Sequence, residues 1–432
     1  MSATHTYAGI ENGHEGIFVP AWHTNPSVSE VVRLAKVSRM WNENQVSYFG
    51  QTNGRLPHKT FGIKQRDRLF HTYAIGRTGA GKTTLLETLF LQDMEQGRGC
   101  ALIDPHGDLA ERLAAQVPPE RQADLVYMNV ADPNQPYGYN PLRHVRGDKI
   151  PLAASGLIEA LKKLWDDAWG PRMEHILRNT LFALLEYGEA TLPDVLRMLT
   201  DKPFQYEVMK RVTNPQVRNF WLKEFPQYNP RYRQESIAPI QNKIGAFLAD
   251  PRLYRMLTAP PIDLRIRQLM DQGKILIVNL SKGRLGEDTA NLLGALLVST
   301  VSLAAFSRAE LPEHTRRPFF LYIDEFQNFT TLAVASMVSE LRKFNVGLVL
   351  AHQHLHQLEP DVRHAVLANA GTVIAFRLGP EDAPIIAKEL APVFGAEDLV
   401  MLPHHHIALR LMIDGVPTHP FSATTLHPKQ LH

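Results

Sequence analysis

The sequence predicts an α/β fold: a mostly parallel sheet covered by helices and interrupted by an all-α insertion. From Leu69 onward, short apolar runs alternate with helical patterns, as expected of strands that are buried on both faces. One long segment, from about Ile150 to Arg265, shows helical spacing and no strand-like run. The chain has 432 residues, and a single hydrophobic core stops growing at roughly 250–300 residues. A core with an added part is therefore expected.

The first 60 residues mix Pro, Asn, Gly and His without sustained periodicity, apart from one short helical pattern near Ser29–Val37. We assign no role to this N-terminal extension. Farther along, eight apolar runs have the length of buried strands. They are Leu69–Ile75, Ala101–Ile103, Leu125–Val130, Ile275–Leu280, Phe319–Ile323, Val346–Ala351, Thr372–Phe376 and Ile407–Met412.

Residues 150–265 interrupt this alternation. Amphipathic stretches such as Met173–Tyr187 recur there with helical spacing, which predicts an all-α domain inserted between two strands. The predicted organisation is an N-terminal extension over residues 1–60, a core built from 61–149 and 266–432, and an all-α insertion over 150–265.

The composition is that of a soluble globular protein, because 44% of the residues are hydrophobic and 21% are charged. The formal charge of +2 does not decide whether the partner is a polyanion. The single cysteine, Cys100, excludes an internal disulfide framework and fits a reducing compartment. The N-terminus does not resemble a signal peptide. The longest apolar stretch, Leu292–Phe306, is too short for a spanning helix and is predicted to be a core helix.

The segment Gly76–Thr83 fills the phosphate-binding pattern G-x-x-x-x-G-K-[ST] without a mismatch. Its glycines allow backbone N–H groups to turn inward around phosphate, and the helix that follows adds partial positive charge. We expect Lys82 to reach the β- and γ-phosphates of ATP, and the Thr83 hydroxyl to bind Mg²⁺. The predicted nucleotide-binding residues in this segment are Gly76, Thr78, Gly79, Ala80, Gly81, Lys82, Thr83 and Thr84.

Two carboxylates, Asp324 and Glu325, follow the apolar run Phe319–Ile323. A buried strand that ends in acid groups beside a P-loop can hold magnesium and activate water. We predict that Asp324 binds Mg²⁺ through water, and that Glu325 orients and deprotonates the attacking water. Without the P-loop, an Asp-Glu pair at a strand end would carry no such meaning.

Gln353 and Arg342 are two further catalytic candidates. Gln353 follows the run Val346–Ala351, where many ring ATPases carry a polar side chain that senses the γ-phosphate; a surface glutamine without a role is the alternative. The Arg342 guanidinium suits the charge that develops on a transferred phosphoryl group, and a neighbouring subunit could supply it. Lys343 is a competitor for that role, and a solvated helix end is the other interpretation.

Together these motifs resemble the HerA/FtsK superfamily of DNA-pumping ATPases and, within it, the TraG/TraD-like coupling proteins of conjugation and type IV secretion. The resemblance extends over residues 61–425. The runs Ile103–Asp108 and Tyr322–Gln327 make it specific, which a P-loop alone would not. The other matching segments are Phe61–Ile63, Ile75–Thr84, Tyr139–Leu142, Trp169–Met173, Ala351–Gln353 and Gln357–Leu358.

The resemblance implies a RecA-like core whose inserted helical domain helps to recognise a DNA-processing complex. It also implies a homo-oligomeric ring, a hexamer by analogy, with a trans-acting arginine at the position of Arg342. By the same carry-over Asp104 would lie near the nucleotide. The alternative for Asp104 is a turn-forming Asp-Pro pair that caps the following helix.

The expected function is therefore a Mg²⁺-dependent ATPase that moves DNA through an oligomeric ring in conjugative transfer or type IV secretion. Its partners would be DNA and relaxosome or secretion-channel proteins. Membrane-bound members carry N-terminal spanning helices and this sequence shows none, so we expect a cytoplasmic protein, or one held at the inner membrane by partners. The alternatives are a soluble HerA-like translocase in DNA processing or defence, and a secretion ATPase that acts on proteins.

Three weaker signals remain. Residues 204–267 hold 11 basic and 5 acidic residues with interleaved aromatics, which suits either DNA contact or a helical core. The loop Ser281–Arg284 could line a pore or form a solvated turn. Two histidine clusters match no known zinc spacing and lack cysteine partners, so we expect no structural metal there. The residues in question are Phe220, Trp221, Tyr228, Tyr232 and Tyr254 among the aromatics, and His352, His354, His356 and His404–His406 in the clusters.

Overall fold

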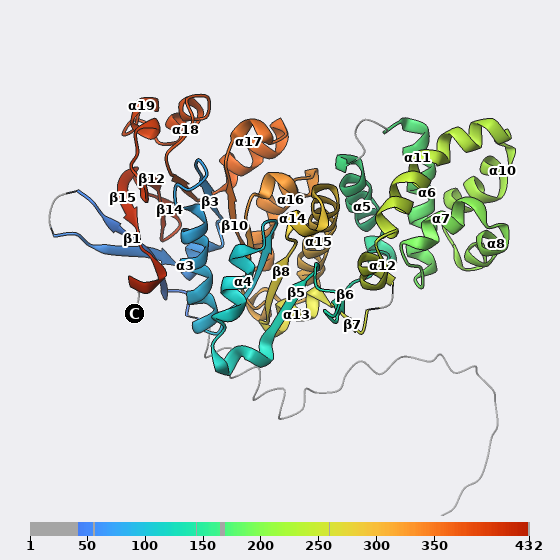
Figure 1. Cartoon of the computed structure of the whole chain (residues 1–432), viewed down its shortest axis with the longest axis horizontal. Coiled ribbons are helices and arrows are strands. Elements are labelled where there is room, and N and C mark those ends of the chain that lie inside the picture. The colour runs from blue at the N-terminus through green and yellow to red at the C-terminus, as the bar shows by residue number, and fades with distance from the viewer. Residues whose placement is uncertain (1–41, 55–56, 144, 165–168, 259, 431–432) are drawn as a thin grey trace, which may run out of the picture. The chain divides into compact units, whose positions relative to one another are not determined.

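The computed structural model describes residues 42–430, except 55–56, 144, 165–168 and 259. The helical pattern near Ser29–Val37 lies outside these residues. A single large sheet runs through the described part of the chain, with helices packed against it (Figure 1).

The sheet has a parallel part and an antiparallel flank. The parallel part consists of β3 (Thr72–Ile75), β4 (Gly99–Asp104), β5 (Leu125–Asn129), β8 (Ile275–Asn279), β9 (Phe319–Ile323), β10 (Val346–His352) and β11 (Thr372–Ala375). The flank consists of β1 (Val46–Thr52), β2 (Thr60–Lys64), β12 (His406–Arg410) and β15 (Phe421–Thr425). The order across the sheet is β2-β1-β15-β12-β11-β3-β10-β9-β4-β8-β5. Each of the eight predicted runs overlaps one of these strands, and the α/β fold class is confirmed.

Residues of β3, β4, β8, β9, β10 and β11 are buried along their full lengths, as expected where helices cover both faces of a parallel sheet. The helices of this core are α3 (Lys82–Glu95), α4 (Asp108–Ala115), α13 (Ile266–Gln272), α15 (Glu287–Ser307), α16 (Leu332–Glu340) and α17 (Pro360–Asn369). Helix α3 packs on β1, β4 and β10, and α4 packs beside it on β4 and β8.

Helix α15 contains the apolar stretch Leu292–Phe306. Within the described residues, Glu287–Glu310 is the one helix long and apolar enough to cross a membrane, and 72% of its apolar window is buried inside the protein. It packs against α5 (Ile150–Leu164), α13 and α16. The prediction of a core helix is confirmed.

The antiparallel flank was not predicted in full. Strands β1 and β2 pair with each other, and β1 also pairs with β15. They are only partly buried, and Gly50 and Gly62 interrupt their patterns, so the period of two is weak. Residues 46–52, which fall inside the segment that gave no strand signal, therefore belong to the main sheet.

Between residues 150 and 258, the described chain forms helices only. Many of these helices begin with proline at the first turn, where its missing N–H costs no hydrogen bond. The side chains of Asp201, Asn214 and Asn229 accept backbone N–H bonds just before three of them. Besides α5, the elements are α6 (Pro171–Tyr187), α7 (Pro193–Thr200), α8 (Lys202–Arg211), α9 (Pro215–Asn219), the π-helix η4 (Phe220–Glu224), α10 (Phe225–Gln227), α11 (Pro230–Leu248) and α12 (Pro251–Thr258).

Short elements complete the described chain. Strands β6 and β7 pair with each other, as do β13 and β14. The short helices and strands are α2 (Gln65–Arg68), β6 (Tyr137–Gly138), β7 (Ile262–Asp263), α14 (Lys282–Leu285), α18 (Ala383–Glu389), α19 (Ala396–Val400), β13 (Met412–Ile413) and β14 (Val416–Pro417).

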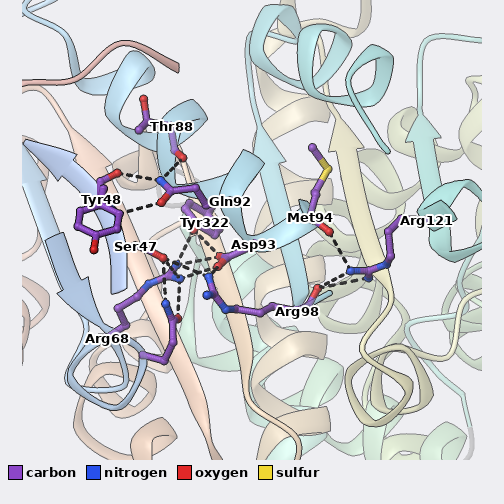
Figure 2. Close-up of polar contacts among 11 residues, drawn as sticks. Ser47, Tyr48, Arg68, Thr88, Gln92, Asp93, Met94, Arg98, Arg121 and Tyr322 are labelled. Carbon is purple, nitrogen blue, oxygen red and sulfur yellow. Dashed lines mark hydrogen bonds and ion pairs between the residues drawn. The ribbon is translucent and has the colours of Figure 1, made fainter. Parts of the chain in front are cut away.

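A buried ionic network joins α2, α3 and β9 (Figure 2). The Asp93 carboxylate accepts two bonds from Arg68, at 2.5 and 2.8 Å, and one from Arg98 at 2.7 Å. The Tyr322 hydroxyl donates to Asp93 at 2.6 Å and accepts from Arg68 at 2.6 Å. Burial opposes ionisation of Asp93, but the two arginines outweigh it and hold its pKa below the ordinary value. The network fixes the helix that follows the P-loop against the strand that precedes Asp324.

Candidate nucleotide-binding site

The predicted P-loop lies between β3 and α3. Residues Gly76–Gly81 connect the two elements, and Lys82 begins the helix. Gly79 and Gly81 have φ values of 75° and 122°, which side chains with a Cβ rarely adopt. A Cβ at Gly76 would lie 2.5 Å from the Phe376 Cβ, so packing also requires glycine there. Ala80, Thr78, Thr83 and Thr84 lie in the same loop and in the first turn of α3.

Lys82 reaches back across this loop. Its Nζ donates to Gly76 O at 2.6 Å and to Arg77 O at 3.3 Å. Burial lowers its pKa, while the charges of Glu325 and Asp324 oppose that shift. The ammonium group is thus placed inside the loop, where a phosphate chain would be gripped.

Asp324 and Glu325 follow β9, which is separated from β3 by β10 alone. The Thr83 hydroxyl donates to Asp324 Oδ2 at 3.4 Å. Burial, and then the charges of Glu325 and Asp104, raise the pKa of Asp324 to about 7. A buried carboxylate beside a hydroxyl is a donor pair that suits Mg²⁺, which prefers oxygen ligands and retains several waters.

Glu325 is held on both carboxylate oxygens. Gln353 Nε2 donates to Oε1 at 2.6 Å, and Gln327 Nε2 donates to Oε2 at 2.8 Å. The Gln353 side chain also accepts from Thr78 Oγ1 at 2.8 Å, so it bridges the P-loop and Glu325. The Glu325 backbone is left-handed, with φ 46°, a strained conformation that is concentrated at functional sites. The structure therefore brings Lys82, Thr83, Asp324, Glu325 and Gln353 together.

Asp104 ends β4 near this cluster, but both of its oxygens are occupied. Oδ1 accepts from His106 N at 2.9 Å, and Oδ2 accepts from Ala110 N at 2.9 Å. These are the contacts of the Asp-Pro turn that holds the start of α4. Asp104 acts on the cluster through its charge, which contributes to the raised pKa of Asp324.

Arg342 lies far from the P-loop of its own chain. It belongs to the 3₁₀ turn η8 (Leu341–Phe344), immediately before β10, whereas the P-loop follows β3. Strands β10 and β3 are parallel, so the two sites are at opposite ends of strands roughly 20 Å long. The exposed Arg342 guanidinium lies 3.5 Å from the centroid of the Phe70 ring.

A segment that the sequence did not single out as part of this site also contacts the P-loop. His404 Nδ1 lies 3.3 Å from Gly79 O, and His405 N donates to Ala80 O at 3.2 Å. His404 Nε2 lies 3.2 Å from the guanidinium of Arg377, whose carbonyl accepts from Arg77 N at 2.9 Å. More than 300 residues separate these histidines from the loop along the chain, so only the fold places them there.

The two histidine clusters divide into separate contacts. His352 lies buried, with Nδ1 3.2 Å from the Tyr73 hydroxyl, and burial lowers its pKa to about 3, with contributions from Lys82 and His354. His354 pairs with Asp382 at 3.1 Å. No group of three His, Cys, Asp or Glu side chains that could hold a metal ion occurs in the part of the chain that the structure describes.

The basic and aromatic segment 204–267 contains both buried and exposed side chains. Phe220 and Trp221 are buried and pack edge to face at 5.3 Å, so these two rings belong to the helical core. Tyr254 is 49% exposed, and the Arg231 side chain is 89% exposed and pairs with Glu235 at 2.9 Å. Ser281–Arg284 leads from β8 into α14, and Arg284 is exposed.

A cavity of about 700 Å³ lies elsewhere, between Tyr139–Pro141, α13 and the end of α15. Helix α13 precedes β8, so this cavity is at the amino end of the strands, opposite the P-loop. It contributes nothing to the site described above.

Comparisons with known proteins agree with this architecture. A family model described as the type IV secretion-system coupling protein DNA-binding domain matches residues 56–407. The plasmid coupling protein TrwB, solved with a non-hydrolysable GTP analogue, is 17% identical over 92% of both chains, with a TM-score of 0.63. TrwB with ADP and Mg²⁺ is 17% identical over 91% of this chain and 92% of that one, with a TM-score of 0.62.

VirB4 of Thermoanaerobacter pseudethanolicus is 14% identical over 90% of this chain and 99% of its own, with a TM-score of 0.61. At such identities the likeness shows a shared fold, here that of RecA-like P-loop ATPases. A sequence search of curated proteins finds no significant match.

Proposed function

This chain belongs to the family of type IV secretion-system coupling proteins, and from that membership we propose that it hydrolyses ATP to move DNA through a ring of its own copies. The ring would be a hexamer, working in the cytoplasm or at the inner membrane, and its partners would be relaxosome or secretion-channel proteins. TrwB has been solved with ADP and Mg²⁺ and with ATP and GTP analogues, which supports the same ligands here.

The observation that carries the proposal is the convergence of five side chains at one end of the parallel strands. Lys82 would bind the β- and γ-phosphates, and Thr83 and Asp324 would hold Mg²⁺. The bound ion would offset the charge of the phosphates. Glu325 would take a proton from the attacking water, because Gln353 and Gln327 hold its carboxylate in place.

Gln353 would report the γ-phosphate, since it touches both Thr78 and Glu325. Loss of the γ-phosphate on hydrolysis would therefore shift the contacts of Gln353 with Thr78 and with Glu325 together. Arg342 would act on a neighbouring subunit, because it lies at the opposite end of β10 from the P-loop of its own chain. The helical part, residues 150–265, would contact DNA or the DNA-processing complex.

The proposal is tested by steady-state ATPase assays with and without single- and double-stranded DNA over a range of protein concentrations. Turnover should rise with both DNA and protein concentration, because hydrolysis would depend on ring assembly. Lys82→Ala should abolish turnover, and Glu325→Gln should lower kcat by about 10²- to 10⁴-fold while ATP still binds.

An ATPase rate that neither single- nor double-stranded DNA changes would contradict translocation and favour a secretion ATPase that acts on proteins. Full activity in Glu325→Gln would contradict the assignment of the general base. DNA-stimulated turnover in a chain that serves no secretion system would favour the soluble HerA-like alternative.

A further inference from the structure

The sheet order fixes the direction in which a nucleotide must lie. Asp324 and Glu325 follow β9 and Gln353 follows β10, and both strands lie on one side of β3. These side chains mark the γ-phosphate end of the site. The next strands on the other side of β3 are β11 and β12. The nucleoside end of the nucleotide therefore has to lie on that side of the P-loop, next to the carboxyl end of β11.

Arg377 and the turn Pro403–His406 occupy that position. Arg377 follows β11, and the turn leads into β12, which is antiparallel to β11 and therefore begins at the same end of the sheet. Gly79 O only accepts hydrogen bonds, so His404 donates to it through Nδ1. Arg377 only donates, so His404 Nε2 accepts from it. His404 thereby orients the Arg377 guanidinium beside the P-loop.

His405 is placed by a strained backbone. Its φ of 63° is unusual for a residue with a Cβ, and Thr425 N holds it by donating to His405 O at 2.9 Å. A Cβ on Gly81 would lie 3.0 Å from His405 Nδ1, so the imidazole lies directly against the loop. His404 and His405 are both exposed, and among the described residues no carboxylate contacts Arg377.

We propose that Arg377 and His405 form the subsite that receives the nucleoside of the bound nucleotide, with His404 as the residue that positions Arg377. The inference rests on the proposed ATPase function. A planar guanidinium and an imidazole both offer flat faces on which a base stacks. The subsite is assembled from the two segments that pack on the outer face of the P-loop, so it is continuous with the phosphate site.

The test compares the binding of ADP with that of inorganic tripolyphosphate, both with Mg²⁺, by titration calorimetry. Arg377→Lys keeps the charge and removes the flat group. His405→Asn removes the ring and keeps a residue that tolerates positive φ. Each should weaken ADP binding about tenfold and leave tripolyphosphate binding within about twofold. Arg197→Lys, an exposed arginine on α7, is the matched control and should change neither.

Equal losses for both ligands would show that the two side chains serve the phosphates, and would overturn the subsite. Unchanged ADP binding in both variants would overturn it as well. Thermal unfolding of each variant should match the wild type, which separates lost contacts from lost folding. If the wild-type chain binds neither ligand, the nucleotide site itself fails, and that result is distinct from a failure of the nucleoside subsite alone.

Discussion

Asp324 is buried beside two other carboxylates, and its pKa is about 7. In the unfolded chain the same group ionises near pH 4. Between those values the unfolded state loses its proton first, so the stability that this residue contributes falls as the pH rises. Ionised Asp324 therefore lowers the free energy of unfolding, as expected of a buried group whose role is to bind a cation.

Asp324→Asn should therefore stabilise the nucleotide-free protein more at high pH than at low pH. In urea unfolding with EDTA present, the gain over wild type should grow by about 2 kcal/mol between about pH 5.5 and about pH 8. Asp361→Asn, an exposed carboxylate on α17, is the control and should show no growth. A gain independent of pH would mean that Asp324 is already ionised at the lower pH.

At the scale of elements, helix α5 is tied to the loop after β9. Lys163 Nζ donates to Gln327 O at 2.5 Å and to Thr330 Oγ1 at 2.8 Å, and Gln327 in turn holds Glu325. Lys163 is an exposed residue, but desolvation of its ammonium group at these two contacts lowers its pKa to about 8. Hydrogen bonds through Gln327 therefore connect Glu325 to the first helix of the all-α segment.

Lys163→Met should lower kcat about tenfold and leave KM for ATP within about twofold, because the P-loop contacts are untouched. Lys162→Met, from the exposed neighbouring position on α5, is the control in the same ATPase assay. Equal loss in both variants would show that the charge of the helix matters and not the bond to Gln327.

The elements also show what sequence patterns can reveal. Buried parallel strands give continuous apolar runs, so the seven parallel strands of the main sheet were predictable. The P-loop and the Asp324–Glu325 pair followed from their positions at strand ends. Strands β1 and β2 were missed because half-buried antiparallel strands with glycines lack a clear period. Strand β15 was missed because it is short and carries one serine and two threonines among its five residues. The contacts of His404 and Arg377 depend on tertiary pairing, which no local pattern records.

At the scale of the whole molecule, the distance between Arg342 and the P-loop leads to a mixing experiment. Arg342→Ala and Lys82→Ala should each be nearly inactive alone. When the two variants are mixed in equal amounts, about a quarter of the contacts between subunits would join an intact P-loop to an intact arginine, so the ATPase activity should partly return. Wild-type activity in Arg342→Ala, or no recovery from subunits that do co-assemble, would rule out a role across subunits.

The position of β3 in the sheet has a consequence for how the protein is made. This strand ends at Ile75, but its two neighbours begin only at Val346 and Thr372. A chain emerging from the ribosome must keep an apolar strand unpaired on both edges until most of synthesis is finished. Nascent chains that stop before β11 would therefore be targets for chaperones and proteases, and none of them could complete the sheet beside the P-loop.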